Sequence, residues 1–380
     1  SERMYIKPFG VERWLSKYET TVDYNLTSTS IMPLSINELL EITGEDEEKV
    51  KEDLFSLKLN YGSIEGRPEY RLGIASLYQT IQKEQVISTN GGVGASHLTM
   101  VTVVEPGDHV VAILPAYQQI YSVPESIGAK MDYVFLEKTA SGYVLDLNKL
   151  ATLVTPQTKA VVFNNPNNPT GDVMTDETLE KMVEIARVND SYLICDEAYR
   201  GLTHDVGFSA SVADLYEKGI SLGSMSKAFA MAGVRLGWIA CRDAKFMQDV
   251  HIYRDYTMIS NGGIDEYVAS LALKHKDAVQ QRNMGITQKR AVLFKKWLAG
   301  EPKLSYAPFK GGTVALPYFE SNLSSEEFCA KIIEEKSVLL MPGFVFDLEK
   351  CFRMGYAREP EEKMIAGLER VSDFLAKLKQ

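Results

Sequence analysis

Between Val86 and Ala240 the sequence alternates short apolar runs with segments of helical periodicity. This alternation restricts the fold most, because a strand–helix–strand connection places successive strands parallel, with the helices packed on the sheet. It predicts an α/β fold with a mostly parallel mixed sheet and helices on both faces. The link between the last two strands is too short for a helical crossover, so one strand is expected to be antiparallel. The predicted strands are residues 86–89, 109–114, 131–136, 159–164, 192–195, 220–223 and 236–240.

The chain on either side of this alternation has a different pattern. Residues 68–82 and 95–104 are expected to be helices, and a long helical pattern begins at residue 281. The mixed strands and helices that follow are typical of an α+β unit. We therefore expect a large domain over residues 46–280 and a smaller α+β domain from residues 1–45, which include an N-terminal arm, and 281–380.

Charge and composition exclude several classes of protein. The net charge is −10 and there is no basic run, which disfavours a nucleic-acid partner. Charged residues are scattered through the N-terminal stretch and no long uncharged apolar segment follows, so neither a signal peptide nor a membrane anchor is expected. The four cysteines form no Cys-x-x-Cys pair and the five histidines lack metal-ligand spacing. This pattern predicts a reduced, cytoplasmic protein without a metal site.

Four residues with complementary chemistry fall on one bend between the last two predicted strands: Ser224, Ser226, Lys227 and Arg235. Hydroxyls and a guanidinium supply directed donors for a dianionic phosphate. A lysine among apolar neighbours can lose its proton and attack a carbonyl. A lone Ser-x-Ser-Lys is more often a solvated loop, but the spacing to Arg235 and its flanking glycines favours a site.

This segment resembles the Schiff-base lysine segment of the class I/II aminotransferase family, whose members are fold-type I enzymes dependent on pyridoxal phosphate (PLP). The resemblance implies that Lys227 is the catalytic lysine. It also implies that Ser224, Ser226 and Arg235 bind the cofactor, and that residues 46–280 form a PLP-binding domain.

The run Asn90-Gly-Gly-Val-Gly94 lies between a predicted strand and a helix, where successive backbone N–H groups can approach an anion. It lacks the Gly-x-Gly-x-x-Gly pattern and a following Walker lysine, so dinucleotide and nucleoside triphosphate sites lack their fingerprints. Glycine-rich turns of this kind are common. Beside the lysine segment, however, the run is similar to the family's phosphate cup, which implies phosphate contacts from Gly92, Val93 and Gly94.

Three further motifs follow predicted strands, and each taken alone is also typical of a polar turn, a helix cap or a core aromatic. The run Asn-Asn-Pro-Asn-Asn-Pro-Thr-Gly resembles the family's N-P-x-N-P-T-G motif, in which Asn168 would bind the cofactor's ring oxygen and the substrate carboxylate. The match to the D-E-x-Y motif implies that Asp196 pairs with the pyridine nitrogen and that Tyr199 holds the ring oxygen, both as catalytic residues. Tyr117 would stack on the pyridine ring.

Two resemblances concern the substrate and a second subunit. Arg353 interrupts an apolar strand, where a buried charge requires a partner. It corresponds to the family's C-terminal arginine, which binds the substrate α-carboxylate as a bidentate pair. Tyr61 corresponds to a tyrosine that reaches the cofactor phosphate of the other subunit. The resemblance therefore implies a homodimer with shared active sites.

The sequence before Ser260-Asn261 bears on the substrate. In aspartate enzymes of the family an arginine shortly before this pair reads a second carboxylate, whereas here the nearest arginine is Arg254. We therefore expect a monocarboxylic amino acid as the substrate. Its side chain is expected to contact Tyr256, Trp14 and residues 30–32.

The expected activity is transfer of an α-amino group to a keto acid by a PLP-dependent aminotransferase. Two other activities stay open: β-elimination, as in a C–S lyase, and cyclisation, because the cofactor carries the electronics of all three. The stretch Leu26-Thr-Ser-Thr-Ser-Ile31 is faintly similar to capreomycidine synthase, a family member that cyclises an arginine derivative. A PLP-sensing regulator is a third alternative, but about 60 residues before Tyr61 leave little room for a DNA-binding domain.

Overall fold

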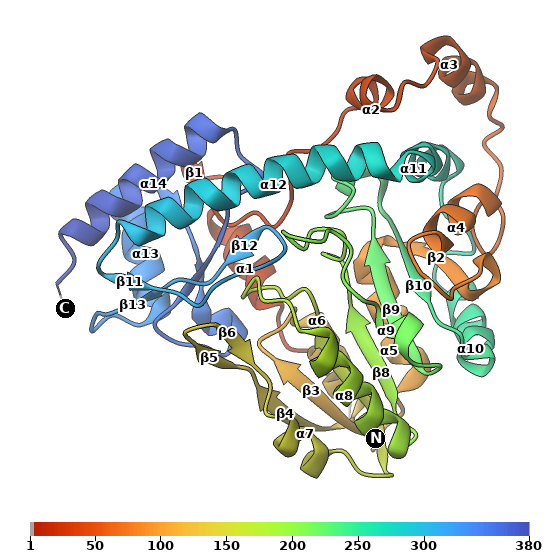
Figure 1. The fold of residues 1–380 in the computed structure, drawn as a ribbon, viewed down its shortest axis with the longest axis horizontal. Helices are drawn as coiled ribbons and strands as arrows, with labels where there is room; N and C mark the ends of the chain where they lie inside the picture. The colour runs from red at the N-terminus through yellow and green to blue at the C-terminus, as the bar shows by residue number, and fades with distance from the viewer. Residues whose placement is uncertain (1–3, 380) are drawn as a thin grey trace.

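A seven-stranded sheet forms the centre of the protein, in a computed structural model that describes residues 4–379. The strand order is β2-β10-β9-β8-β7-β3-β4, and only β10 runs antiparallel to its neighbours (Figure 1). This confirms the predicted α/β fold and its single antiparallel strand. The strands are β2 (Val86–Asn90), β3 (His109–Leu114), β4 (Lys130–Phe135), β7 (Thr158–Asn164), β8 (Tyr192–Asp196), β9 (Gly219–Ser224) and β10 (Leu236–Ala240).

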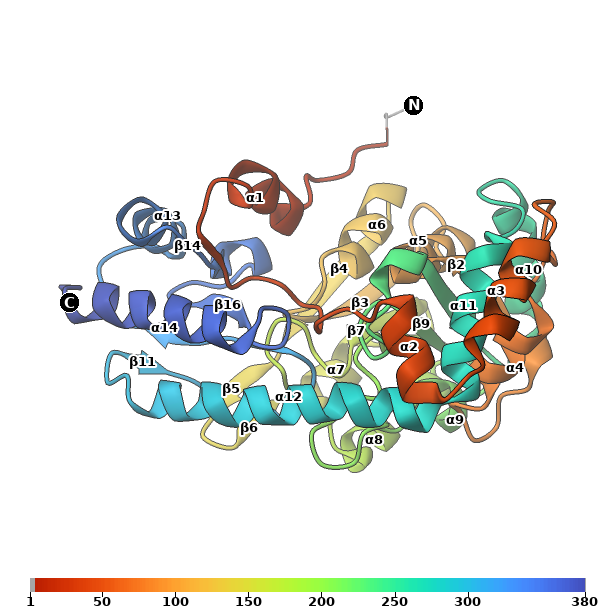
Figure 2. The ribbon, with the colours of Figure 1, turned by 90° about the horizontal axis from the view of Figure 1, so that it is seen from above.

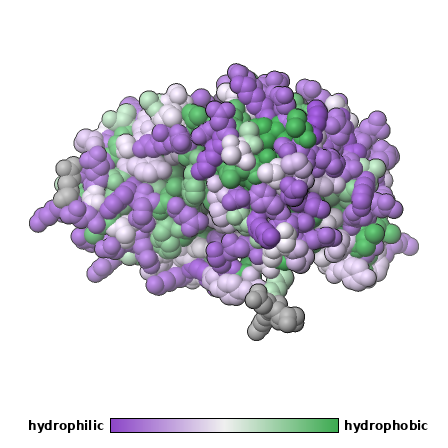
Figure 3. All heavy atoms as spheres, turned by 90° about the horizontal axis from the view of Figure 1, so that it is seen from below, coloured by the Kyte–Doolittle hydropathy of each residue, from purple (hydrophilic) through white to green (hydrophobic). Residues whose placement is uncertain are grey.

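Helices cover both faces of this sheet because its central strands are apolar on both sides. On β3, Val110 and Ala112 face one core cluster, whereas Val111 and Ile113 face another. The first cluster packs against α5 (Gly91–Val103), α6 (Gln119–Ile127) and α10 (Ala244–Asp255). The second packs against α7 (Leu147–Leu153), α8 (Asp176–Val188) and α9 (Val212–Leu215). On the face of the molecule drawn in Figure 3, hydrophilic side chains predominate over hydrophobic ones.

Two predicted helices have different bounds in the structure. Helix α4 (Pro68–Ala75) ends well before residue 82, because the chain turns so that the Tyr78 hydroxyl can meet Ser221 Oγ at 2.7 Å. Helix α5 begins at Gly91 rather than Ala95, so most of the glycine-rich run is its first turn. A hairpin of β5 (Glu137–Thr139) and β6 (Gly142–Val144) was not predicted.

The chain leaves the sheet through α11 (Gly263–Lys274) and the 24-residue helix α12 (Lys276–Ala299), which runs to a second group of elements (Figure 1). These are β11 (Leu304–Ser305), β12 (Val314–Ala315), β13 (Tyr318–Phe319), α13 (Ser325–Lys336), β14 (Val338–Leu339), β15 (Met341–Pro342), β16 (Phe352–Gly355) and α14 (Glu361–Ala376). β12, β16 and β15 form a three-stranded sheet. From this arrangement we propose that the second group of elements forms the small domain, with its boundary to the large domain between residues 280 and 281.

The N-terminal segment lies against this second group before it crosses to the first. After α1 (Gly10–Tyr18), β1 (Tyr24–Asn25) pairs in parallel with β14. The backbone then continues beside β16, where Gly355 N donates to Leu26 O at 2.8 Å and Met32 N donates to Ala357 O at 2.9 Å. Figure 2 shows this segment in red, on its way to α2 (Ile36–Thr43) and α3 (Glu47–Ser56).

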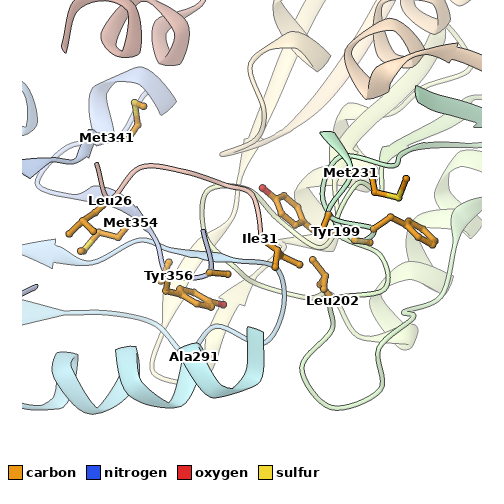
Figure 4. Packing of buried hydrophobic residues seen from close by; sticks show 14 of the residues in the cluster. Leu26, Ile31, Tyr199, Leu202, Met231, Ala291, Met341, Met354 and Tyr356 are labelled. Atoms are coloured by element: carbon orange, nitrogen blue, oxygen red, sulfur yellow. The ribbon is translucent and has the colours of Figure 1, made fainter. Parts of the chain in front are cut away.

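The crossing segment carries apolar side chains into one continuous core. Leu26 lies beside Met354, whereas Ile31 lies beside Tyr199 and Leu202, on the side of the large sheet (Figure 4). Helix α2 then starts with a capping box, in which Ser35 Oγ accepts from Glu38 N at 3.0 Å. The arm is therefore anchored at both ends, and its middle, residues 27–30, lies above the carboxyl edge of the large sheet.

Candidate active site

The site lies where β7, β8 and β9 end, at the carboxyl edge of the sheet, the usual position for ligands in open α/β folds. Asn164, Asp196 and Ser224 are the last residues of these strands. A cavity of about 300 Å³ opens beside them. Its walls are Val11, Glu12, Leu15, Glu19, Asn25, Thr27, Ser28, Thr29, Gly92, Val93, Tyr117, Asn164, Asn168, Asp196, Ala198, Tyr199, Ser224, Ser226, Lys227, Ala232, Arg235 and Arg353.

Lys227 reaches into this cavity from the turn after β9. Its Nζ donates to Thr29 Oγ1 at 2.7 Å and to Ser30 Oγ at 3.4 Å, both on the arm. Burial lowers the pKa of Lys227 to about 8. The positive charge of Arg353 acts in the same direction, and the negative charge of Asp196 opposes it. Near pH 8 about half of these amines are therefore neutral and nucleophilic.

Asp196 places an anion at the base of the cavity. Its Oδ1 accepts a hydrogen bond from Ala198 N at 3.1 Å. Burial raises the pKa of Asp196 to about 6, while that hydrogen bond and the charge of Lys227 act in the opposite direction. The carboxylate stays ionised at neutral pH, and it can pair with a protonated ring nitrogen.

The N-terminus of α5 and the turn after β9 form an anion cup. The Asn90 side chain does not cap α5, so the first N–H groups of the helix can bind a ligand. Gly92 and Val93, in this first turn, line the cavity. Gly91 has φ +70°, and a Cβ there would lie 2.7 Å from Arg235 Nη2. A Cβ on Gly92 would lie 3.2 Å from the Cβ of Ser224. Backbone N–H groups, hydroxyls and a guanidinium packed this closely fit a phosphate dianion.

The structure places the predicted cup residues unequally. Gly92, Val93, Ser224, Ser226 and Arg235 line the cavity. Gly94 does not, because α5 turns it toward Asn90, whose Cβ would lie 3.3 Å from an added Cβ. Its assignment to the phosphate cup has no support from this geometry.

Of the four asparagines at and after the end of β7, three hold the turn and the fourth, Asn168, binds Arg353. Asn165 Oδ1 accepts from Met174 N at 2.9 Å, and Asn167 Oδ1 accepts from Thr170 N at 3.1 Å. Asn164 Nδ2 donates to the carbonyl of Asp196 at 2.9 Å and so ties the ends of β7 and β8 together. Asn164 Oδ1 also accepts from Asn168 N at 3.0 Å, which fixes the backbone of Asn168 at the cavity wall.

Two tyrosines line the cavity at the predicted positions. The Tyr199 hydroxyl donates to Thr29 O at 3.1 Å, and burial raises the pKa of this hydroxyl. The ring of Tyr117 packs against Phe9, with the ring centroids 5.2 Å apart. Burial also raises the pKa of Tyr117, so both hydroxyls stay protonated and can act as donors.

Arg353 enters the cavity from β16. Its side chain is only 2% exposed. Nη1 donates to Asn168 Oδ1 and Nη2 donates to Thr27 O, both at 3.0 Å, while Nε has no partner among residues 4–379. Burial lowers the pKa of Arg353 to about 10, and no carboxylate of the described chain lies within ion-pair distance. A buried guanidinium in this state fits an incoming carboxylate.

Tyr61, Tyr256 and Trp14, which were expected to serve an active site, lie outside this cavity, as does Arg254, which was not expected to read a second carboxylate. Tyr61 and Tyr256 are 77% and 88% exposed on the surface of the chain. Trp14 is buried and donates from Nε1 to Leu340 O at 3.0 Å, so it anchors α1 and does not line the pocket. Arg254 is also fully buried elsewhere, where Nε donates to Ser88 O at 2.7 Å and Nη1 to Ile259 O at 2.7 Å.

The sequence analysis missed the part of the arm that closes the cavity. Thr27, Ser28 and Thr29 line it, rather than Ile31 and Met32, and Ser30 contributes only through Lys227. The carbonyl of Thr29 accepts from both Tyr199 and Thr313. The one available signal was the unusual Thr-Ser-Thr-Ser run itself, which marks a hydrogen-bonding segment but does not name its partners.

The fold and the site together define a class of protein. Four features meet at the carboxyl edge of a doubly wound sheet: a lysine whose pKa is lowered to about 8, a buried carboxylate, an anion cup and an arginine without a carboxylate partner in residues 4–379. These residues fit PLP, with the phosphate at the cup, the ring nitrogen at Asp196 and the carbonyl carbon at Lys227. No group of side chains in residues 4–379 has the composition of a metal site. The class is that of the fold-type I PLP enzymes.

Comparison with known proteins gives the family. The sequence model of aminotransferase class I and II matches residues 29–371, and the chain belongs to this family of PLP-dependent aminotransferases. A PLP-dependent aminotransferase from Streptococcus suis 89-1591 is 37% identical and superposes with a TM-score of 0.94, covering 99% of this chain and 100% of that one. The fold class, the cofactor and the enzymatic nature of the protein expected from the sequence are thereby confirmed.

Two curated relatives differ in their reactions. An aspartate aminotransferase from Sulfurisphaera tokodaii is 29% identical over 83% of this chain and 81% of its own length. A capreomycidine synthase from Streptomyces vinaceus is 26% identical over 85% of this chain and 82% of its own. The family is therefore shared by enzymes of different specificity, and the substrate has to be argued from this chain's own cavity.

Proposed function

We propose that the enzyme transaminates an α-amino acid with a single carboxylate, using a keto acid as acceptor. The observation that supports this most is Arg353, a buried cation in the cavity with no carboxylate partner in the described chain. A substrate α-carboxylate would supply the missing partner, and Asn168 would hold the arginine in place through its contact at 3.0 Å.

The remaining residues would act on the bound substrate as follows. PLP, when bound, accepts the amino group and withdraws electrons from the substrate α-carbon. Lys227 Nζ would remove the proton from the substrate α-carbon. Its lowered pKa suits it to this role as a general base. Asp196 would keep the ring nitrogen protonated, and Tyr117 would stack on the ring. Thr27, Ser28 and Thr29 of the arm would cover the bound substrate and exclude water from it.

Among residues 4–379 of this chain, the cavity offers no good partner for a second carboxylate. Arg235 and Arg353 are the arginines that line it, and Arg235 belongs to the anion cup. Arg254, the remaining candidate, is held by backbone carbonyls outside the cavity. We infer that aspartate and glutamate are poor donors, in contrast to the activity named for the Sulfurisphaera tokodaii relative.

A panel of amino acids tests the proposal. Each would be added to the holoenzyme without acceptor, and the change in the cofactor's absorption would report amino transfer. Neutral or basic monocarboxylic amino acids should give the largest change. Aspartate or glutamate as the best donor would refute the proposed substrate class while leaving the family unaffected.

Cyclisation is the second candidate, and the similarity to capreomycidine synthase favours it over elimination. The two reactions differ in their need for a second substrate. A transaminase requires a keto acid for continued turnover, whereas a cyclase does not. Product formed in many turnovers without any added keto acid would show cyclisation, and a single turnover that stops would show transamination.

We also propose that the protein is a homodimer with shared active sites. Tyr61 and Tyr256 are large, largely exposed side chains outside their own cavity, and Phe55, Leu59, Ile64 and Ile259 are exposed hydrophobic residues near them in sequence. Exposed apolar side chains in this number are typical of an interface. Light scattering that shows an active monomer would refute this proposal.

The described chain, residues 4–379, has no helix long and apolar enough to cross a membrane. We propose a cytoplasmic location on a separate observation: Cys195, Cys241, Cys329 and Cys351 are all buried free thiols, as expected in a reducing compartment. Fractionation of cells that finds the protein outside the cytoplasm would contradict this.

A further inference from the structure

One wall of the cavity is acidic, and the proposed function leaves it unused. Helix α1 lines the cavity with Val11, Glu12, Leu15 and Glu19, whose spacing places them on one side of the helix and its end. Neither carboxylate takes part in an ion pair or a side-chain hydrogen bond within residues 4–379. Two free carboxylates therefore border a cavity that already contains cationic residues.

Another residue of the same cavity independently indicates a ligand. Arg353 is 2% exposed, and its Nε is buried without a partner. Burial lowers the pKa of Arg353, and the negative charge of Glu12 is among those that oppose this effect. Glu12 acts in the same sense on Lys227, whose pKa is also lowered mainly by burial. The acidic wall and the two cations thus face one common space.

The other walls already have roles in the proposed function. The cup between α5 and Arg235 receives phosphate, while Asp196 and Tyr117 face the cofactor ring. A substrate with its carboxylate at Arg353 and its α-carbon at Lys227 leaves α1 as the wall for its side chain.

We propose that Glu12 and Glu19 select substrates with a cationic side chain. The structure thus assigns a basic amino acid, with an ammonium or guanidinium group beyond the α-carbon, as the class of amino donor. This inference rests on the proposed function and narrows it. The aliphatic stem of such a side chain would pack on the buried Val11, which precedes Glu12, and on the half-buried Leu15, which lies between the two carboxylates in the sequence. The same carboxylates would repel an acidic side chain.

A binding experiment without chemistry isolates this charge. Hexanoate and 6-aminohexanoate share a carboxylate and a chain length, lack an α-amino group, and differ in one terminal ammonium. Their dissociation constants would be measured by calorimetry on the holoenzyme, on Glu12→Gln/Glu19→Gln, and on Glu41→Gln. Glu41 is an exposed, unpaired carboxylate of α2 outside the cavity and controls for overall charge.

The expected result is a change in the ratio of the two constants. The preference for 6-aminohexanoate over hexanoate should fall by about 3- to 10-fold in the double variant, the range for one or two partly exposed ion pairs. Hexanoate binding should stay unchanged, and Glu41→Gln should match the wild type. A ratio that is equal in all three proteins would overturn the inference.

Turnover of L-arginine and L-citrulline separates this inference from the proposed function, because the two side chains have nearly the same shape and differ in charge. Arginine should be preferred by the wild type, and the double variant should lose that preference. Equal use of both amino acids by the wild type overturns the inference and leaves the proposed function standing. Use of aspartate or glutamate alone overturns both.

Discussion

Asp196 carries its charge at neutral pH although its position at the end of β8 disfavours that charge. Burial raises its pKa to about 6, above the ordinary value near 4. The folded protein therefore binds more protons at this site than the unfolded chain does between about pH 4 and 6. The contribution of this group to stability falls as the pH rises through that window and stays low above it.

Asp196→Asn is expected to make the cofactor-free protein more stable at pH 8, by about 1–3 kcal/mol, because the amide keeps the hydrogen bond from Ala198 and removes the desolvated charge. The gain should shrink as the pH falls from 6 toward 4, because the folded wild-type protein then holds this carboxyl protonated and no longer buries its charge. Urea denaturation at pH 4.5 and pH 8 measures the difference. Turnover by the variant should be strongly reduced, and a loss of stability at pH 8 would contradict the explanation.

Arg353→Met should separate binding from folding. The variant loses two hydrogen bonds, to Asn168 and Thr27, but it also loses a buried unpaired charge, so its thermal midpoint should change little. The value of kcat/KM should fall by a factor that corresponds to about 2–5 kcal/mol of lost binding free energy. Arg353→Lys keeps the charge without the planar fork and should recover only part of this loss. Unchanged kcat/KM in Arg353→Met would remove the arginine from the substrate site.

Individual site residues were predictable where a local motif carries the chemistry. Lys227, Asp196, Asn168 and Arg353 stand in such motifs, and the structure brings all four to one cavity. Glu12 was not predictable, because nothing near it in the sequence indicates which surface α1 will cover. Trp14 was expected in the pocket as part of the N-terminal arm, but its ring packs against Phe344 and donates to Leu340 O in the second group of elements instead.

At the scale of elements, the first turn of α5 has two kinds of glycine. Gly92 faces Ser224 across the anion cup, and Gly94 faces Asn90 inside the chain. Gly92→Ala should crowd the cup and weaken PLP binding by about 5- to 100-fold, the equivalent of 1–3 kcal/mol of overpacking. Gly94→Ala is the matched control on the same turn and should leave PLP affinity unchanged. Equal effects in absorbance titrations would show that both glycines, or neither, shape the cup.

Element existence was better predicted than element length. The strands of the large sheet follow from their apolar runs, since both faces are covered by helices. The end of α4 could not be predicted, because the contact of Tyr78 with Ser221, 143 residues away, decides it. The early start of α5 was hidden because glycine is a poor helix former, and only the adjacent strand and Arg235 make a helix there favourable.

At the scale of the whole molecule, shared active sites predict complementation between two inactive chains. If Tyr61 serves the partner's cavity, a dimer of one Lys227→Ala chain and one Tyr61→Ala chain has one intact site, which combines Lys227 of the second chain with Tyr61 of the first. Random mixing should then restore about a quarter of wild-type activity. Either variant alone should stay inactive or nearly so. No recovery after verified exchange of subunits would mean that Tyr61 does not cross the interface.

The pairing of the N-terminal arm with the C-terminal strands also sets the order in which the protein can be completed on the ribosome. Residues 24–32 are synthesised well before their partners, Leu339, Gly355 and Ala357, which follow much later in the chain. Until then Thr29 has no platform from which to meet Lys227, and the large sheet can form while its cavity stays open. Catalytic competence is therefore withheld from the nascent chain until residues 338–357 have been made, so a shorter polypeptide has no assembled site in which to consume cofactor or substrate.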